Sequence, residues 1–454
     1  MSDSKPRFSV PHPLVLLGGC VILAAAASYV LPAGEFDRAD DEATGRSVVV
    51  AGTYHAVERT PVNLFDAMVA LPRGMAEAGE VIFLVFLIGG AFTVVDESGA
   101  LRRGVTSLVR TLGGRDLLVI PIVSIFFATG GVVENMQEEI IPLIPVLLVL
   151  TRTVGFTPLV AVAMSAGAAF VGSAFSPINP FQVQIAQNLA ELPLGSGGLF
   201  RGIFLILALA LWIGMTMRYA SRERRAPEVV EDSGDAGIGG KDWVIFGLVA
   251  ATFALIVIGF VPRWGWGWGF NEMSAAFFIM GAVIGLFAGM GLTGTAEAYV
   301  RGFRSMAYAA LLIGFARAIF VVLRDGHIVD TIVHAMFMPL EGLPLIASSL
   351  GMVVAQAAIH VPVPSVSGQA VLTMPVLVPL SDLLGLSRQV VVLAYQYGAG
   401  LCDIITPTNG ALLAMLAAAG VRYEDWIKFA VPLYLALVAL GAVSIAIAIA
   451  IGLA

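Results

Sequence analysis

The apolar stretch of residues 156–191 is interrupted by Ser176-Pro177-Ile178-Asn179-Pro180, and the stretch 388–419 is interrupted by Thr406-Pro407-Thr408-Asn409-Gly410. Each stretch is too long for one straight helix across a hydrocarbon core of roughly 30 Å, which needs about 20 apolar residues. Proline removes a backbone hydrogen bond and kinks or ends a helix. We therefore interpret each stretch as one membrane span that is broken in its middle.

The two interrupted stretches are related by a shift of 230 residues. Residues 137–180 align with residues 367–410 without a gap, and ten of the 44 aligned pairs are identical. The identical pairs include prolines, glycines and asparagines, which chance matching in an apolar sequence would not favour: Pro145/Pro375, Gly155/Gly385, Pro177/Pro407 and Asn179/Asn409. The sequence therefore contains an internal repeat.

Further apolar runs predict the rest of the fold. Seven are long enough to cross a bilayer in one piece, and they lie near residues 12–31, 80–96, 199–217, 242–261, 273–291, 304–324 and 426–453. Two regions, 115–153 and 342–383, instead contain pairs of shorter arms joined at residues 130–139 and 362–369, and we interpret them as re-entrant hairpins. The expected fold is an all-α polytopic membrane protein with about nine transmembrane spans, two of them broken, plus two re-entrant hairpins.

Positive charges predict the orientation. With the N-terminus in the cytoplasm, 16 of the 25 lysines and arginines fall in cytoplasmic segments, 8 fall outside and Arg317 lies within a span, as the positive-inside rule requires. Two crossings precede the first hairpin and three precede the second, so the halves face opposite ways, an inverted repeat typical of secondary transporters. We divide the chain into a first half, 1–220, with a cytoplasmic-side hairpin at 115–153, a cytoplasmic linker, 221–241, and a second half, 242–454, with an outer-side hairpin at 342–383.

Composition excludes several classes of protein. The 454 residues are 58% hydrophobic and 13% charged, whereas soluble domains have about 25% charged residues. A net charge of −7 provides no basic surface for phosphate backbones, so we expect no nucleic-acid partner. The two cysteines and five histidines show no disulfide or metal-ligand spacing, which argues against the chemistry of a soluble enzyme.

The helix breaks predict a site. An unpaired backbone group in hydrocarbon costs several kcal/mol, so broken helices persist only in protein interiors or around a polar cavity. The carbonyl end of one half-helix can bind a small cation, and the amide end of the next can bind a carboxylate. The alternative is that Pro177 and Pro407 only kink two helices. Candidate Na⁺ ligands are the side-chain oxygens at the breaks and a nearby acid, namely Ser176, Asn179, Thr406, Asn409 and Asp403.

The hairpin tips add polar residues of two kinds. The first tip carries acids, including Glu138 and Glu139, and the second carries hydroxyls and amides. A carboxylate at membrane depth is usually paired or functional, so Glu138 or Glu139 could bind a coupling cation, accept a proton or hold a substrate ammonium group; alternatively, these acids are solvated at the cytoplasmic surface.

Arg317 lies inside an apolar run and needs a partner. It could hold a substrate carboxylate or pair with Glu138 or Glu139; the alternative is that it snorkels to the outer interface. The predicted substrate-binding residues are Asn179, Asn409, Arg317, Glu138, Glu139, Ser365, Ser367, Gln369 and Thr408.

Several stretches resemble one family of carriers. They are Ile88-Gly89-Gly90-Ala91-Phe92, Glu138-Glu139, Ser176 to Pro180, Ser367-Gly368-Gln369-Ala370-Val371-Leu372-Thr373-Met374-Pro375, Arg388-Gln389-Val390 and Thr406 to Gly410. Through them nearly the whole chain resembles the YfcC-type carriers of the DcuC-like (C4-dicarboxylate anaerobic carrier) family, within the ion-transporter superfamily. Two positions depart from the family pattern. The tip Ser365-Val366-Ser367-Gly368-Gln369 stands where the family often has Ser-Gly-Ser-Gly-Gln, and Ala399 replaces a frequent Asp, which removes that carboxylate from a cation site.

The resemblance implies a multi-pass carrier of the bacterial inner membrane, with a scaffold and a transport subdomain, that works as a homodimer by an elevator motion. We therefore expect a secondary active transporter for a small carboxylate-bearing metabolite, a C4-dicarboxylate or an amino acid, coupled to Na⁺ or H⁺ or working as an exchanger. Its expected partners are this substrate, a coupling cation, the lipid bilayer and a second copy of the chain. The alternatives are a cation/proton antiporter or a channel of the same superfamily, and a membrane enzyme, which lacks any metal or nucleophile constellation here.

Overall fold

The computed structural model describes residues 11–41, 46–112, 114–227, 238–260, 266–340 and 342–453. These residues are mostly helical, with two short antiparallel pairs of strands: β1(Gly34–Glu35) with β4(His55–Ala56), and β2(Arg38–Asp41) with β3(Arg46–Val49). Of the predicted linker, 221–241, residues 228–237 lie outside the described part of the chain.

The helices before the linker are α1(Pro13–Val30), α2(Leu64–Glu77), α3(Gly79–Glu97), α4(Ala100–Leu112), α5(Val119–Glu134), α6(Ile144–Thr153), α7(Pro158–Val162), α8(Ala168–Ala174), α9(Ile185–Leu189) and α10(Gly198–Arg222). Those after it are α11(Gly240–Phe260), α12(Phe270–Phe287), α13(Gly291–Asp325), α14(Val329–Phe337), α15(Leu345–His360), α16(Val366–Leu384), α17(Arg388–Cys402), α18(Gly410–Ala418) and α19(Tyr423–Ala450). Short 3₁₀ segments are η1(Asp116–Leu118), η2(Glu138–Leu143) and η5(Met338–Leu340), and π-helical segments are η3(Ala163–Gly167) and η4(Pro180–Gln184).

Nine helical segments of the described residues are long and apolar enough to cross a membrane, which confirms a mostly helical, multi-pass protein. Seven coincide with the uninterrupted runs: α1, α3, α10, α11, α12, α13 and α19. The other two, Asp116–Glu134 and Val366–Leu384, are single arms of the two predicted hairpins. The two broken stretches are divided into shorter helices. The nine segments therefore include one arm of each hairpin region in place of the two broken spans that were predicted. Helix α13 also begins at Gly291, earlier than the predicted 304, because its first turns are polar but still helical.

Each predicted hairpin region contains two helical arms joined by a short turn. In the first, α5 continues to Glu134 and the left-handed conformation of Asn135 (φ 60°) ends it, as is common after a helix C-terminus. The prediction that residues 130–139 form the joint was therefore too wide, because residues 130–134 remain helical. In the second region, α15 and α16 are joined by residues 361–365.

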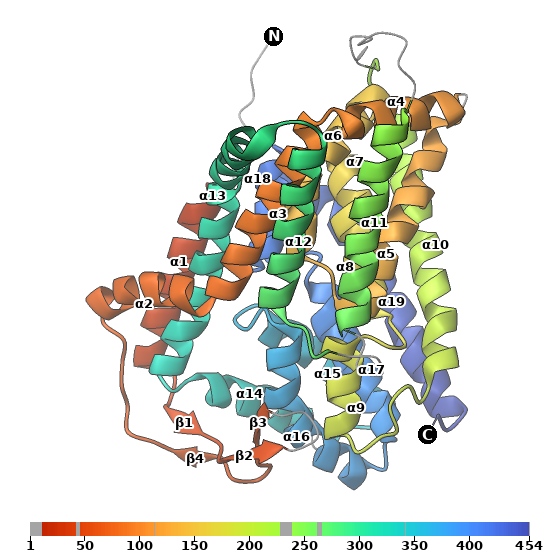
Figure 1. The fold of residues 1–454 in the computed structure, drawn as a ribbon. Helices are drawn as coiled ribbons and strands as arrows, with labels where there is room; N and C mark the ends of the chain where they lie inside the picture. Colours follow the sequence, from red (N-terminus) through yellow and green to blue (C-terminus); the bar gives the residue numbers. More distant parts are fainter. Residues whose placement is uncertain are drawn as a thin grey trace, which may run out of the picture.

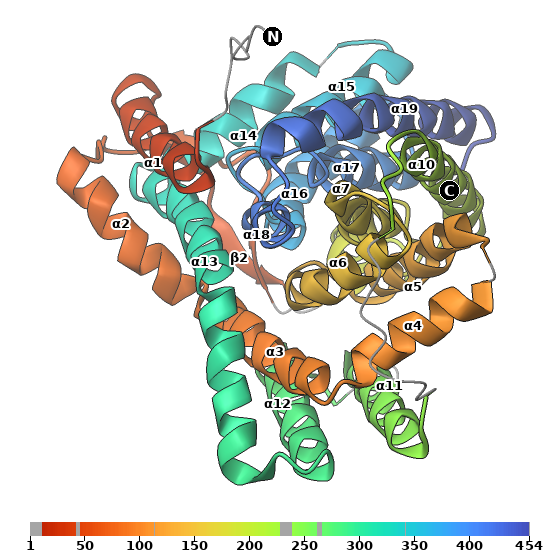
Figure 2. The ribbon, with the colours of Figure 1, turned by 90° about the horizontal axis from the view of Figure 1, so that it is seen from above.

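The helices form two groups. Seen from above, α1, α2, α3, α12 and α13 lie together beside a compact group of α5 to α8 and α15 to α19 (Figure 2). Figure 1 shows α6 and α7 in the half of the bundle nearest the N-terminus, and α15 and α16 in the half nearest the strands. Helix α2 lies across the bundle direction rather than along it (Figure 1).

Small residues allow the helices to approach closely. A Cβ added at Gly302 of α13 would lie 2.6 Å from the Cα of Gly90 in α3. A Cβ at Gly131 of α5 would clash with the carbonyl oxygen of Ala169 in α8. Such backbone contacts are typical of helices that associate within membranes, and they explain part of the glycine content of these segments.

Positions separated by 230 residues adopt the same local structure. Gly155 and Gly385, which follow the second arms of the hairpin regions, have φ values of 77° and 70°. Helix α5 packs against α8 in the first half, and α15 packs against α17 in the second. Helix N-caps also match at this shift, Thr157 with Ser387 and Asn179 with Asn409. The repeat seen in the sequence is therefore present in the turns and caps.

Candidate functional site

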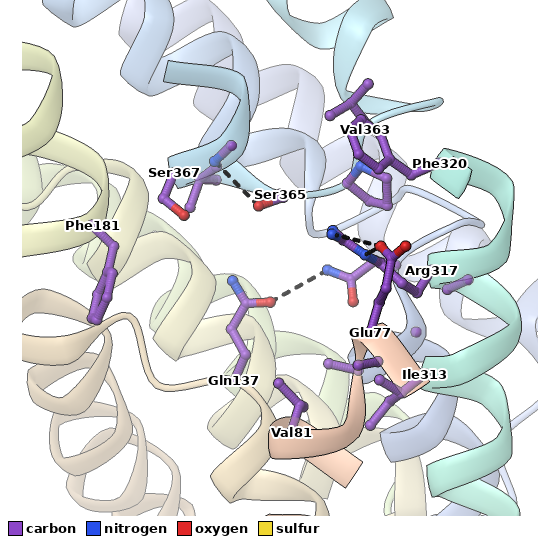
Figure 3. Close-up of a pocket in the computed structure, with 18 of the residues that line it drawn as sticks. Glu77, Val81, Gln137, Phe181, Ile313, Arg317, Phe320, Val363, Ser365 and Ser367 are labelled. Atoms are coloured by element: carbon purple, nitrogen blue, oxygen red, sulfur yellow. Dashed lines mark hydrogen bonds and ion pairs between the residues drawn. The ribbon is translucent and has the colours of Figure 1, made fainter. Parts of the chain in front are cut away.

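A cavity of about 830 Å³ lies between the two groups of helices. Its wall combines the ends of α2 and α5, parts of α3 and α13, the tips of both hairpin regions, the N-terminus of α18 and the strands. In Figure 3, Ser365 and Ser367 lie across the opening from Gln137. The polar and charged lining residues are Glu35, Arg38, Ser47, Glu77, Glu80, Glu134, Asn135, Gln137, Glu138, Glu139, Arg317, Arg324, Ser365, Ser367, Thr408 and Asn409.

The cavity gathers most of the predicted substrate-binding residues. Seven of the nine line it, namely Arg317, Glu138, Glu139, Ser365, Ser367, Thr408 and Asn409. Asn179 and Gln369 do not line it and are buried behind its wall. Among the candidate Na⁺ ligands, only Asn409 lines the cavity, while Ser176, Asn179, Thr406 and Asp403 are buried in the compact group.

The first break is held by its own side chains. The Oδ1 atom of Asn179 accepts the backbone N–H groups of Phe181 (3.0 Å) and Gln182 (2.9 Å), so it caps η4. Its Nδ2 atom donates to the carbonyl of Gly131 in α5 at 2.8 Å. The hydroxyl of Ser176 donates to a carbonyl of α5 at 2.8 Å and accepts two backbone N–H groups. The break is thereby attached to the first hairpin region.

The second break carries a buried carboxylate with three donors. Asp403 is 4% exposed, and its Oδ1 atom accepts from Asn409 Nδ2 at 2.7 Å and lies 2.8 Å from His360 Nε2. Its Oδ2 atom accepts from Gln137 Nε2 at 3.0 Å. His360 is completely buried, and its Nδ1 atom lies 2.9 Å from Gln369 Oε1. Asp403 therefore joins the second break to the tips of both hairpin regions.

Arg317 has an acidic partner that the sequence analysis did not identify. Its guanidinium lies 3.2 Å from Glu77 at the end of α2 (Figure 3). Arg324 pairs with the same carboxylate at 2.6 Å. The prediction that Glu138 or Glu139 balances Arg317 is therefore wrong, because Glu77 is nearer in the fold. Desolvation favours a higher pKa for Glu77, but the two arginines outweigh it and hold that pKa below its usual value.

The three lining acids of the first tip lack a basic partner among the described residues. Glu134, Glu138 and Glu139 all border the cavity, and in the described part of the chain none of them forms an ion pair with an arginine or lysine. Glu139 accepts the backbone N–H of Gln137 at 3.0 Å. The Oε2 atom of Glu134 is buried without a hydrogen-bond partner among the described residues. A buried carboxylate oxygen in this condition favours binding of a cation or a proton.

The sequence analysis did not identify three residues that the structure places at or near the site. Glu77 lies on a short helix whose sequence does not indicate a transmembrane span. His360, like the other histidines, has no second histidine at a metal-ligand spacing. Arg201, counted with the outer charges, is completely buried. The one sequence signal was position, because His360 ends an apolar helix directly before the second tip.

One protein family and two relatives match the chain over nearly its whole length. The family described as C4-dicarboxylate anaerobic carrier, DcuC, matches residues 10–450. A protein of Escherichia coli (strain K12) named "Putative basic amino acid antiporter YfcC" is 30% identical over 94% of this chain and 94% of its own length. An "Uncharacterized protein" of Haemophilus influenzae (strain ATCC 51907 / DSM 11121 / KW20 / Rd) is 26% identical over 99% of both chains.

Two solved structures are also similar to the chain. The YdaH transporter of Alcanivorax borkumensis is 20% identical, with a TM-score of 0.48, over 97% of this chain and 99% of its own. The MtrF structure of Neisseria gonorrhoeae is 19% identical, with a TM-score of 0.43, over 96% of this chain and 95% of its own. The family and sequence matches indicate a transporter rather than an enzyme. Because the family match covers nearly the whole chain, this multi-pass membrane protein belongs to the C4-dicarboxylate anaerobic carrier (DcuC) family of membrane transporters and carriers.

Proposed function

We propose that the chain is a secondary active transporter for an amino acid with a cationic side chain, and that the cavity of about 830 Å³ is its substrate site. The charge of the lining carries this proposal. Each lining arginine already has an acidic partner: Arg38 pairs with Asp330, and Arg317 and Arg324 both pair with Glu77. In the described part of the chain the three acids at the first tip have no such partner, so the lining favours a cation over a dianion.

The opposite wall suits the carboxylate of the same substrate. The N-termini of α16 and α18 both border the cavity, at Ser365 to Gly368 and at Asn409 to Ala411. Backbone N–H groups at a helix N-terminus bind anions, and the helix dipole adds to this attraction. An amino acid would place its carboxylate against these termini and its ammonium or guanidinium group toward Glu134.

The comparisons support two different substrates. The family description refers to C4-dicarboxylates, while the Escherichia coli relative is named for basic amino acids. We favour the second for this chain because of the unpaired acids. A C4-dicarboxylate remains the alternative, and the two helix N-termini are the observation in its favour.

The proposed mechanism is an elevator motion of the compact group against the outer group. The position of the cavity between these groups supports it, because a relative movement would change the cavity's access. The proposed halves are 1–220 and 242–454, related as an inverted repeat, with the linker 221–241 and the N-terminus in the cytoplasm. The matched turns and caps support the repeat, and the charge count supports the orientation in a bacterial inner membrane. The proposed active form is a homodimer.

Within this site, the predicted residues have different proposed roles. Ser365, Ser367, Thr408 and Asn409 would contact the substrate carboxylate, since they line the cavity at the helix N-termini. Glu138 and Glu139 would contribute to the acidic wall with Glu134. Asn179 and Gln369 are buried behind the wall, so we propose that they position the first break and His360.

Exchange in proteoliposomes tests the proposal. The full-length protein would be reconstituted with unlabelled L-arginine inside, and uptake of radiolabelled L-arginine, L-lysine, L-alanine and succinate would be measured. We expect L-arginine and L-lysine to exchange and succinate not to exchange. Exchange of succinate in place of both basic amino acids, also from vesicles loaded with succinate, would overturn the substrate assignment in favour of the alternative.

Variants locate the substrate within the cavity. Glu134→Gln keeps the size of the side chain and removes its charge, so we expect at least about a tenfold loss of apparent affinity for L-arginine, equal to about 1.4 kcal/mol. The matched control is Glu297→Gln, at an exposed acid of α13 whose nearest basic partner is Arg301 at 3.9 Å. Unchanged kinetics in Glu134→Gln would refute a role for this acid in substrate binding.

A further inference from the structure

The side-chain oxygens predicted to bind Na⁺ are already used by the protein. At the first break, the hydroxyl of Ser176 and the Oδ1 atom of Asn179 each accept two backbone N–H groups. At the second break, the Oδ1 atom of Asn409 accepts the backbone N–H of Leu412 at 2.9 Å. Each of these oxygens has two lone pairs for a donor or an ion. At the first break both side-chain acceptors are therefore saturated, and at the second one lone pair of Asn409 is already used.

A buried arginine stands beside the first break. Arg201 of α10 is completely buried, and among the described residues none of its hydrogen-bond partners is an acid. Its guanidinium donates to the side-chain oxygens of Gln396 (3.1 Å) and Gln389 (3.0 Å) and to the carbonyl of Ser196 (2.8 Å). All three acceptors are neutral amide-type oxygens, which are the kind of ligand that a Na⁺ site would use.

The arginine is connected to the end of the first half-helix. Gln396, which accepts from Arg201, donates its own side-chain N–H to the carbonyl of Ser176 at 2.8 Å. This carbonyl follows the C-terminus of α8, where the helix dipole favours a positive charge. Burial of a cation costs several kcal/mol unless polar groups surround it. The location of Arg201 beside a helix C-terminus, among amide oxygens, meets this requirement.

At the second break, three hydrogen-bonding side chains contact the carboxylate of Asp403. Gln137, Asn409 and His360 surround its two oxygens. Of the two neighbouring threonines, Thr406 lies 3.0 Å from the sulfur of Cys402, and Thr408 donates to the carbonyl of Val361. Three donors therefore occupy three of the about four lone-pair positions of the carboxylate, and the hydroxyls of both threonines already contact other groups.

Hydrogen-bond partners fix the proton count at His360. The Nε2 atom of Gln369 donates to the carbonyl of Gln356 at 2.7 Å, and a carbonyl can only accept, so the oxygen of Gln369 faces His360 Nδ1. The Nδ1 atom must then carry a hydrogen. A second proton is needed between Nε2 and Asp403 to make the contact of 2.8 Å favourable. The pair therefore holds one proton beyond the Nδ1 hydrogen, whichever partner carries it.

We propose that the protein supplies its own positive charges at both breaks, Arg201 at the first and the proton shared by His360 and Asp403 at the second, so that transport requires no Na⁺. The statement about transport rests on the proposed function, whereas the statement about ion binding does not. Among the described residues, the titratable groups around the shared proton include Glu138 and Glu139, which follow the Asp403 partner Gln137 at the first tip, and the thiol of Cys402, which ends α17 directly before Asp403.

Thermal unfolding of the full-length protein in detergent tests ion binding without any transported substrate. An ion that binds only the native state raises Tm in proportion to RT ln(1 + [L]/Kd). We expect equal Tm values in NaCl, KCl and choline chloride at the same ionic strength. A rise in Tm that occurs in NaCl alone would overturn the inference, whatever the protein transports.

Chemical rescue tests the role of Arg201. Arg201→Ala leaves a cavity lined by amide oxygens, so low concentrations of guanidinium, but not of choline, should recover part of the lost Tm. The control is Arg218→Ala, which removes an exposed arginine from the same helix and should show neither the loss nor the rescue. Absence of rescue in a folded Arg201→Ala protein would refute the resident cation. If that variant does not fold, the salt series on the unchanged protein still decides whether the native protein binds Na⁺.

Transport separates the two proposals. In the exchange assay with L-arginine, replacement of all Na⁺ by choline on both sides of the membrane should leave the initial rate within about twofold, which is about 0.4 kcal/mol. A rate that falls tenfold or more without Na⁺ would overturn the inference while leaving the proposed substrate intact. If no amino acid is exchanged but NaCl has no specific effect on Tm, the proposed function fails and the inference about ion binding stands.

Discussion

The contact between His360 and Asp403 should show a measurable energetic coupling. Both residues are buried, and their contact joins the end of α15 to the second break. His360→Ala, Asp403→Ala and the double variant form a double-mutant cycle. The cycle isolates the energy of the pair from the separate effects of losing each side chain.

The structure gives the size of the expected effects. His360→Ala leaves the Oε1 atom of Gln369 without its donor and removes one of three donors from Asp403. A buried unsatisfied acceptor costs about 1–3 kcal/mol, and a lost hydrogen bond to a charged group about 1.5–3 kcal/mol. The single variants should therefore each lose about 3–5 kcal/mol of unfolding free energy, the range for a broken buried pair. The double variant should lose less than the sum, by about 1.5–3 kcal/mol.

The assay is equilibrium unfolding in mixed micelles, with intrinsic tryptophan fluorescence as the signal. A neutral buried pair provides the control, because Tyr397 Oη lies 2.9 Å from Ser444 Oγ between α17 and α19. The cycle of Tyr397→Phe and Ser444→Ala should give a coupling of about 0.5–1.5 kcal/mol, the net value of a neutral hydrogen bond. A coupling for His360 and Asp403 within about 0.5 kcal/mol of zero, the usual limit of additivity, would refute the shared proton.

Three further outcomes follow from local geometry. Gly385→Ala should lower the unfolding free energy by about 1–2 kcal/mol, because alanine there meets only the positive φ. Gly131→Ala should lower it more, because its Cβ meets the carbonyl of Ala169; equal losses would contradict this. Gly155→Ala should cost more than Gly385→Ala, since its Cβ also lies 2.5 Å from a carbonyl oxygen; a thermal melt compares them. Because the folded pKa of Glu77 is depressed, its stabilisation should be present above the unfolded pKa of about 4.3 and be lost as pH falls through the lower folded value; a Glu77→Gln protein should lack this acid-dependent loss of Tm.

Much of the fold could be predicted from local patterns. Apolar runs located seven of the nine helical segments that, among the described residues, are long and apolar enough to cross a membrane, because about 20 apolar residues have few alternatives to a transmembrane helix. Proline and asparagine located both breaks, because proline cannot continue a helix and asparagine caps the next one. The hairpin tips were placed less accurately, since the end of α5 depends on the left-handed conformation of Asn135 and not on composition.

The partners within the site could not be predicted in the same way. Glu77 is 240 residues from Arg317, and its helix is short and amphipathic, so no transmembrane signal marks it as a neighbour. His360 and Asp403 are 43 residues apart on different elements. Hydrophobic periodicity predicts which face of a helix is buried, but it does not predict which polar groups meet after the helices pack. Arg201 shows the same limit, because its position near the end of an apolar run is equally typical of an exposed interfacial arginine.

The two breaks differ chemically at one pair of equivalent positions. Ser173 and Asp403 are separated by 230 residues, and each accepts a hydrogen bond from the capping asparagine of its own break, at 3.3 Å from Asn179 and at 2.7 Å from Asn409. The neutral Ser173 lies in the half of the chain that contains the buried Arg201, whereas Asp403 contacts His360. Of the described break residues 176–180 and 406–410, those that line the cavity are Thr408, Asn409 and Gly410 of the second break. A permanent charge cannot change during a transport cycle, whereas a shared proton can. From this asymmetry we propose that the first break has a structural role and that any proton-linked step takes place at the second, beside the proposed substrate cavity.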